Sequence, residues 1–527
     1  MNLDSMRRHG ENEVVDAVVI GTGAGGAPLL AKLAAGGLRV VALEAGRNWE
    51  PGEHTADETE GCDINWMEER LSTGTTPTAF GANNSGTGVG GSTLHWGAFT
   101  PRPDPRDMAL RSTTGMGHDW PVSHAELVGY IEEVERFIGV SGPARYPWDP
   151  ARSYPLPPAP RNASADMMAR GCAELGITTA DAPAALVSRD WHQPGAGLRQ
   201  ACVSCGSCHQ GCRNASKASM DTTYLPMAVA HGAEIRAGCR VFGIELDAAG
   251  RVSAVLYRHD GIEHRQRCAA LFVCAGGIET PRLLLHTGLA NGSGQVGRNF
   301  LAHGATQVWG RFDTEMRSHR GYPSSLLTED LLRPADADFA GGYLIQSLGA
   351  MPVTLANSMA RGAGLWGKPL VDAMHGYRFM SGVGINAECL PAAGNRLELS
   401  SELDAFGMPK AVVSFSAGDN EKAIDRHATR VMRNIVEAAG AQETMVLSRT
   451  AHTIGTCRMG DDRETAVVDG DGRSFDIDNL WICDNSVFPS ALVANPALTI
   501  MALSLRTADR FLAGRRRNAG SSSSSSG

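Results

Sequence analysis

Short apolar runs alternate with glycine-rich or polar turns in the N-terminal part of the chain. A β-branched and apolar run at 14–20 is typical of a buried parallel strand. A glycine-rich segment at 21–26, a helix-like apolar segment at 28–35 and a second apolar run at 38–43 follow it. This order predicts a strand–turn–helix–strand unit, the building block of an α/β fold with a parallel sheet.

The turn of this unit has the chemistry of a nucleotide-binding loop. Gly21, Gly23 and Gly26 form a GxGxxG sequence. The first glycine permits a tight turn, the second lets a pyrophosphate approach the backbone, and the third lets the helix pack close to the strand. The free N–H groups of the helix N-terminus then point at the phosphates. Glu44 ends the second strand, where a carboxylate can accept both hydroxyls of a ribose. The motif predicts dinucleotide binding and does not distinguish FAD from NAD.

The remaining pattern predicts a second, inserted domain. A second strand–glycine–helix unit spans 269–286, and alternating strands at 396–399 and 410–415 precede a helix at 420–439. We expect an α/β fold in which a Rossmann-type nucleotide-binding domain is interleaved with an antiparallel-sheet-plus-helix substrate domain. The expected nucleotide-binding segments are 1–110, 200–300 and 445–515, the substrate segments are 111–199 and 301–444, and the serine-rich tail at 516–527 is expected to be disordered.

Composition narrows the class of partner. The chain has 527 residues, 43% of them hydrophobic and 20% charged, with a formal net charge of −9. The negative net charge argues against nucleic acid or an anionic membrane surface as the partner. No apolar run is long enough to span a bilayer, and the polar start at 1–12 lacks the apolar region of an export signal. The expected compartment is therefore the cytoplasm.

Four cysteines lie within one short segment, at Cys202, Cys205, Cys208 and Cys212. This spacing is the one that bacterial ferredoxins use for an iron–sulfur cluster, although Arg213 replaces the usual proline. Three ligands to a three-iron cluster, a structural zinc and unliganded thiols are the alternatives. A cluster passes one electron at a time and would make the protein a dehydrogenase connected to a cytochrome or quinone. Without a cluster, oxygen or a soluble acceptor is expected.

Three C-terminal motifs add a family resemblance. They are the segment from His452 to Gly460, the strand-like segment 480–484 and the segment 494–500, which contains Asn-Pro. With these motifs and the glycine-rich turns, the chain resembles the glucose–methanol–choline (GMC) family of flavin oxidoreductases. The resemblance covers roughly 14–110, 200–300 and 450–512, in the family's order, and it is loose in the two substrate-domain segments.

The resemblance implies FAD as the cofactor and assigns residues to it. Gly21, Gly23, Gly25, Gly26 and Glu44 correspond to the ADP-binding fingerprint, and Gly90, Gly91, Ser92 and His95 to a second glycine-rich loop beside the flavin. Val241 falls where the family contacts adenine through its backbone, Asp484 near the ribityl and phosphate region, and Asn495 and Thr499 against the isoalloxazine. The loop before His95 is similar to that of pyranose oxidases, in which a histidine bonds covalently to the flavin; a noncovalent contact is the alternative.

The resemblance also assigns the catalytic pair. His452 matches the family's catalytic histidine, and Asn495 takes the place of its partner. Oxidising an alcohol requires removal of the hydroxyl proton as hydride leaves the carbon. A neutral imidazole suits that proton because its pKa lies near operating pH. The Asn495 amide can donate to the same oxygen but cannot be the base.

The expected function is FAD-dependent oxidation of a primary or secondary alcohol to the carbonyl. The nearest branch of the family is that of sugar, polyol and gluconate dehydrogenases, so a carbohydrate-like substrate is expected, a glycoside or aminoglycoside hydroxyl included. A sterol or other lipophilic alcohol is the alternative substrate. Two other classes of function remain open, a flavin and iron–sulfur electron-transfer subunit without an alcohol site, and a lyase of the same family.

Overall fold

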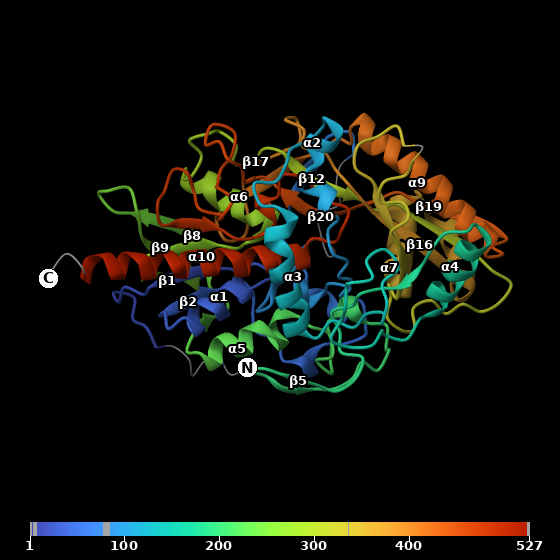
Figure 1. Ribbon diagram of the computed structural model, residues 1–527, viewed down its shortest axis with the longest axis horizontal. Coiled ribbons are helices and arrows are strands. Elements are labelled where there is room, and N and C mark those ends of the chain that lie inside the picture. The colour runs from blue at the N-terminus through green and yellow to red at the C-terminus, as the bar shows by residue number, and fades with distance from the viewer. Residues whose placement is uncertain (1–2, 4–7, 77–84, 336, 524–527) are drawn as a thin grey trace.

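The computed structural model describes residue 3 and residues 8–76, 85–335 and 337–523. Figure 1 shows two sheet-containing regions along the long axis, one around β1 and β2 and the other around β16 and β19. The long C-terminal helix α10 (Ala497–Ser523) runs along the first region, and the helices α4 (Ala163–Glu174) and α9 (Asp419–Ala438) lie in the second.

A five-stranded parallel sheet forms the first region. Its strand order is β21-β11-β1-β2-β7. The strands are β1 (Ala17–Ile20), β2 (Val40–Leu43), β7 (Glu234–Arg236), β11 (Leu271–Val273) and β21 (Leu480–Ile482). Every residue of β1 and β2 is buried, as expected for strands covered on both faces. The predicted Rossmann-type arrangement is confirmed, with strands drawn from three distant parts of the chain.

Helices and a small antiparallel sheet complete this region. Helix α1 (Gly26–Ala35) packs against α5 (Tyr224–Ala230) and α10, and α6 (Gly276–Thr287) follows β11 as the second strand–glycine–helix unit. The antiparallel sheet contains β8 (Arg240–Leu246), β9 (Val252–His259) and β10 (Ile262–Arg267). Further elements are α2 (Leu110–Thr114), α3 (His124–Ile138) and the hairpin of β5 (Trp191–Gln193) and β6 (Gly197–Arg199).

An eight-stranded antiparallel sheet forms the second region. Its strands are β4 (Ala180–Asp181), β12 (Phe300–Gly304), β13 (Gln307–Arg311), β14 (Leu326–Thr328), β15 (Tyr343–Leu348), β16 (Met380–Ala387), β19 (Glu443–Leu447) and β20 (Thr450–Gly455). Helix α9 packs against α4 and on the sheet through buried residues such as Ile424, Met432 and Ile435. The helices α7 (Pro352–Gly362) and α8 (Gly367–His375) pack against each other beside β19.

The strands expected around 400 form a separate small sheet. They are β17 (Arg396–Leu403) and β18 (Pro409–Ser414), and β18 also pairs with β3 (Leu71–Thr73). The strands β19 and β20 belong to the eight-stranded sheet, although the expected nucleotide-binding block 445–515 contains most of them. β20 pairs with β12, with His303 opposite Ala451 and a register shift beside it. His452 therefore lies on a strand of the eight-stranded sheet itself.

Helix α10 continues to Ser523 and so extends into the serine-rich segment 516–527. Adding residues to a helix that is already nucleated costs much less than starting one, and α10 is held by its buried apolar residues between 498 and 512. Residues 524–527 lie outside the described part of the chain. Among the described residues, no helix is both long and apolar enough to cross a membrane.

The close packing of α1 on the parallel sheet generates a prediction. A Cβ atom at Gly25 would lie 1.8 Å from the Cys483 carbonyl oxygen, which is backbone and cannot give way. We expect Gly25→Ala to destabilise the fold by about 1–3 kcal/mol or more and to reduce bound nucleotide. Thermal unfolding and nucleotide content of the purified protein measure both effects.

The matched control is Gly129→Ala. Gly129 lies within α3, where an added Cβ meets no heavy atom within 4 Å. This change should leave the nucleotide bound and raise stability by about 0.5–1 kcal/mol. Equal behaviour of the two variants would contradict the packing argument.

Candidate active site

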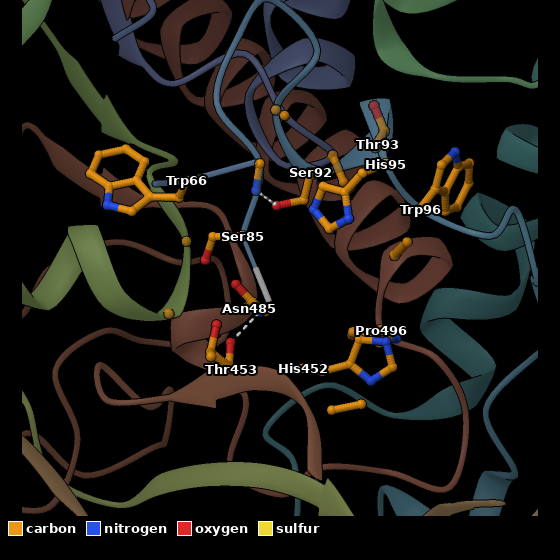
Figure 2. Close-up of a pocket in the computed structure, with 18 of the residues that line it drawn as sticks. Trp66, Ser85, Ser92, Thr93, His95, Trp96, His452, Thr453, Asn485 and Pro496 are labelled. Carbon is orange, nitrogen blue, oxygen red and sulfur yellow. Dashed lines mark hydrogen bonds between the residues drawn. The ribbon is translucent and has the colours of Figure 1, made fainter. Parts of the chain in front are cut away.

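One cavity of about 430 Å³ brings together the carboxyl ends of the parallel strands and the face of the eight-stranded sheet. Most of the predicted site residues line it, namely Gly21, Gly23, Gly25, Glu44, Gly91, Ser92, His95, Val241, His452, Asp484 and Asn495. Gly26, Gly90 and Thr499 are not among the lining residues. Figure 2 shows His95 and His452 on opposite sides of the same open space, with Trp96 and Pro496 beside them.

The two glycine-rich turns contact each other at one end of this cavity. Gly21 has a φ of +91°, and a Cβ at Gly26 would lie 1.9 Å from the Gly21 carbonyl oxygen. A Cβ at Gly91, whose φ is +57°, would lie 2.7 Å from Gly23 Cα. Side chains are excluded at these positions, so backbone N–H groups are left to line the turn. This is the environment in which a pyrophosphate binds.

The buried Glu44 carboxylate joins the two turns. Its Oε2 accepts hydrogen bonds from the backbone N–H and the hydroxyl of Thr22, at 3.0 and 2.8 Å. Its Oε1 accepts from the N–H groups of Gly46 and Gly88. Burial raises the pKa of Glu44, and these four donors oppose that shift. The carboxylate therefore organises the loops as well as lining the cavity.

Asp484 has a comparable function at the second turn. Its Oδ2 accepts from Gly276 N–H at 2.8 Å and from the Thr280 hydroxyl at 2.6 Å, while its Oδ1 accepts from Ser486 N–H. These bonds tie the start of α6 to the end of β21. Burial raises the pKa of Asp484, and the same donors counter the shift.

The lining fits an elongated dinucleotide such as FAD. Glycine turns without side chains lie at one end, and two buried polar atoms without a hydrogen-bond partner among the described residues lie toward the other: His95 Nε2 and Trp96 Nε1. Such atoms are costly unless a ligand or water satisfies them. We infer that the Gly21–Gly26 turn would hold the phosphates and that the loop at His95 would lie beside the redox ring.

A network of buried and partly buried side chains positions His452 at the far end of the cavity. His452, on β20, has a φ of +58°, and its Nδ1 lies 3.0 Å from Nδ1 of His303 on β12. Nε2 of His303 lies 3.0 Å from the Leu492 carbonyl oxygen. Nδ2 of Asn495 lies 3.4 Å from His452 Nε2, and Asn386 donates to Asn495 Oδ1 at 2.9 Å.

This network determines which nitrogen of each imidazole carries the proton. A carbonyl oxygen only accepts, so His303 carries its proton on Nε2 and its Nδ1 accepts. His452 must then donate from Nδ1, which leaves a lone pair on its Nε2, the nitrogen beside Asn495. Burial lowers the pKa of His303 to about 4, and burial, followed by His303, holds the pKa of His452 well below 6.5. Both imidazoles are therefore neutral at neutral pH.

The motifs around His452 contain no sign of His303, which the sequence analysis missed. His303 is separated from His452 by 149 positions and belongs to a strand without a recognisable motif. The only available signal was a histidine within an apolar segment, a pattern that more often marks a satisfied core residue. The structure assigns it a specific partner because β12 and β20 pair directly.

Two buried carboxyl groups hold the backbone that precedes Asn495. Leu492, with a φ of +67°, donates its N–H to Glu388 Oε1 at 3.1 Å, and Val493 donates to Asp107 Oδ2 at 3.2 Å. Asp107 also pairs with Arg333. Burial, then the nearby Asp107, raises the pKa of Glu388 to about 8. The same segment thus presents the Leu492 carbonyl to His303 and the Asn495 amide to His452.

The cysteine segment gives the iron–sulfur hypothesis no support. Within the described residues, no group of three or more His, Cys, Asp or Glu side chains is arranged to hold a metal. Cys212 Sγ instead accepts from Lys217 N–H, and Cys205 is exposed. The buried Lys217 ammonium donates to the carbonyls of Leu94, Trp96 and Cys208. The segment therefore braces the loop that carries His95.

The Glu388 carboxyl generates a stability prediction. Its pKa rises from 4.5 in the unfolded chain to about 8 in the fold, so stability is lost as pH rises from 4.5 to 8. Glu388→Gln keeps the oxygen that accepts from Leu492 and removes this loss. We expect the variant's advantage in unfolding free energy to grow by about 1.4 kcal/mol per pH unit across that window. Denaturant unfolding at several pH values measures it, and the exposed Glu437→Gln is the control. A constant difference between Glu388→Gln and wild type would contradict the prediction.

Comparison with known proteins places this site in a family. Family models described as GMC oxidoreductase match residues 65–305 and 391–504. The chain is 29% identical to the fructose dehydrogenase large subunit of Gluconobacter japonicus, covering 94% of this chain and 97% of that protein. It is 30% identical to 2-methyl-1,2-propanediol dehydrogenase of Mycolicibacterium austroafricanum, covering 94% of each.

Solved structures agree on the fold. Pyridoxine 4-oxidase from Mesorbium loti superposes with a TM-score of 0.65 at 17% identity, covering 94% of this chain and 99% of that one. The family matches include the second glycine-rich turn at Gly90 and Gly91, the strands β7, β11 and β21 of the parallel sheet, and the strand β20 that carries His452. The chain therefore belongs to the GMC oxidoreductase family.

Proposed function

We propose that the protein oxidises an alcohol on a sugar, glycoside or polyol to the carbonyl, with FAD as the cofactor. The observation that carries this proposal is the neutral His452 imidazole, whose Nε2 lone pair faces the cavity beside the Asn495 amide. A pure electron-transfer subunit has no need of such a base. The family membership supports the flavin, and the glycine turns fit its ADP part.

The residues divide the reaction between them. The substrate hydroxyl lies against His452 Nε2, which takes the proton while the His303 hydrogen bond holds the ring. Asn386 donates to Asn495 Oδ1 and so fixes the orientation of the Asn495 amide. Asn495 Nδ2 then donates to the same substrate oxygen, and this hydrogen bond stabilises the developing negative charge. FAD bound beside this pair would supply the acceptor for the hydride that leaves the substrate carbon. The proton and the hydride together complete a two-electron oxidation.

The substrate side of the cavity supports a polar alcohol. Gln307, Gln346, Thr354 and Ser358 line it beside Trp309. Gln346 Oε1 is buried without a hydrogen-bond partner among the described residues. A carbohydrate hydroxyl could donate to it, whereas the apolar surface of a sterol would leave it unpaired. The fructose dehydrogenase large subunit is a relative named for a sugar. The electrons would then leave the flavin for oxygen or a soluble acceptor, because the cysteine side chains are not gathered for a cluster.

Replacing the base tests the proposal. His452→Ala should lower the rate of anaerobic flavin reduction by a sugar or polyol about 10²- to 10⁴-fold, because loss of a general base alone costs that much. Bound FAD should remain, since His452 touches none of the glycine turns. Bleaching of the flavin absorbance in a stopped-flow instrument measures the rate. Reduction at the wild-type rate would remove His452 from the mechanism.

The histidine pair predicts a distinctive pH profile. His452 stays neutral as pH falls through 6.5, because its pKa lies well below that value, so the wild-type rate should stay constant there. His303→Ala removes the acceptor of His452 Nδ1–H and opens space around the ring. The variant should be slower by about 100-fold, the cost of a misplaced catalytic group. Its rate should also fall as pH drops through 6.5.

The readout of this second test is the shape of the profile as well as the rate. A merely structural loss would lower the rate equally at all pH values. Ser381→Ala is a control, because Ser381 is buried on β16 and donates to the Ser164 hydroxyl, away from the histidine pair. An unchanged, flat profile in His303→Ala would contradict the proposed effect of His303.

A further inference from the structure

The strongest unassigned feature of the cavity is the side chain of Arg449. We propose that Arg449 binds a carboxylate on the alcohol substrate, so that the protein's substrate is a sugar-type hydroxy acid, such as an aldonate or uronate. This inference rests on the proposed alcohol oxidation and names the substrate class of the same site.

Arg449 differs from every other charged side chain that lines the cavity. Those side chains all have partners: Glu44 with Thr22, Arg70 and Arg282 with Glu279, Arg240 with Glu68, and Asp484 with Thr280. In the described part of the chain, the Arg449 guanidinium has no hydrogen bond or ion pair, and burial alone lowers its pKa. Arg449 is partly buried, and its guanidinium lines the cavity without a counterion among the described residues. An uncompensated positive charge in a partly desolvated site attracts an anion, which points to one supplied by a ligand.

The position of Arg449 places that anion near the reacting end. Arg449 immediately precedes β20, and its carbonyl oxygen accepts from Ala305 N–H, so the backbone is fixed between β20 and β12. Its charge acts on both His452 and His209, which line the same cavity. A carboxylate held there would place the hydroxyl of the same molecule toward His452 Nε2.

The surroundings reinforce the preference for an anion. The acidic lining residues, Glu44, Glu279 and Asp484, all have their oxygens engaged by the protein. Glu58, the acid that also acts on His209, uses its oxygens at the first turn of α7, where Val353 and Thr354 donate to them. A guanidinium binds a carboxylate through two parallel hydrogen bonds. A polycationic aminoglycoside would face this charge without compensation.

The cofactor's own phosphates are the other anion to consider. The glycine turns that fit a pyrophosphate follow β1 and precede α1, in the parallel sheet. Arg449 lies between β19 and β20 of the eight-stranded sheet, and its charge acts on His452. A guanidinium used by the phosphates would make FAD retention depend on Arg449, and a guanidinium used by the substrate would not.

The experiment compares matched substrate pairs on the FAD-loaded protein. Anaerobic flavin reduction is measured with D-gluconate against D-glucitol and with D-glucuronate against D-glucose, for wild type, Arg449→Lys and Arg449→Met. We expect wild type to prefer the acid of at least one pair. Arg449→Met should lower kcat/KM for the acid about 10- to 100-fold, mainly through KM, and leave the neutral partner within about twofold. Arg449→Lys should retain part of the preference, since it keeps the charge and loses the two-pronged geometry.

A binding measurement without turnover completes the test. Malonate should perturb the flavin absorbance of wild type and not that of Arg449→Met. Equal losses for acid and neutral partners, no preference in wild type, or loss of FAD from Arg449→Met would each overturn the inference. These results differ from failure of the proposed function itself, in which no alcohol, acidic or neutral, reduces the flavin.

Discussion

The hydrogen bond between the buried imidazole of His303 and the partly buried imidazole of His452 is the interaction on which the account of this protein depends. It joins strands β12 and β20 of the substrate sheet, and its direction follows from the Leu492 carbonyl at the other side of His303. Because that carbonyl can only accept, a single backbone group decides the tautomer of the catalytic candidate. Burial keeps both rings uncharged, so the pair needs no counterion.

The interleaved arrangement of the chain makes this pair possible. The nucleotide-binding sheet takes strands from three distant segments, and β20, a strand of the eight-stranded sheet, carries His452 to the cavity. Buried acids then hold the segment before Asn495, with Glu388 and Asp107 accepting from Leu492 and Val493. The left-handed conformation of Leu492 is tolerated because these bonds over-determine it. Fold and site are therefore stabilised by the same contacts.

Local patterns in the sequence predicted much of the fold. The strand–glycine–helix unit at 14–43, the second unit at 269–286 and the helix at 420–439 all correspond to observed elements. These predictions succeed because the periodic spacing of apolar residues and the glycine-rich turns are local features of the sequence. The pairing of β20 with β12 is not local, so the substrate sheet gains a strand that the pattern assigned to the nucleotide-binding block. Helix α10 extends into the serine-rich segment as far as Ser523, because propagation of an existing helix costs little.

The residues of the site likewise divide into those that local sequence motifs predict and those that only long-range packing brings together. Motifs pointed to the glycine turns, Glu44, Asp484, His452 and Asn495 because each lies in a recognisable local pattern. His303, Glu388 and Arg449 lie in segments without motifs, and only the packing of distant strands brings them to the cavity or to its supporting network. The cysteine segment shows that a recognisable local motif can also mislead. Its spacing is typical of a metal site, but among the described residues the side chains are not arranged to hold a metal.

The most direct test of this account is the ¹⁵N chemical shift of the His452 imidazole in the FAD-loaded protein, assigned by comparison with His452→Gln. We predict a neutral ring at pH 6.5 with its proton on Nδ1 and a bare Nε2. A ring protonated on both nitrogens, or one with its proton on Nε2, would contradict the tautomer that the His303 hydrogen bond requires and with it the proposed base.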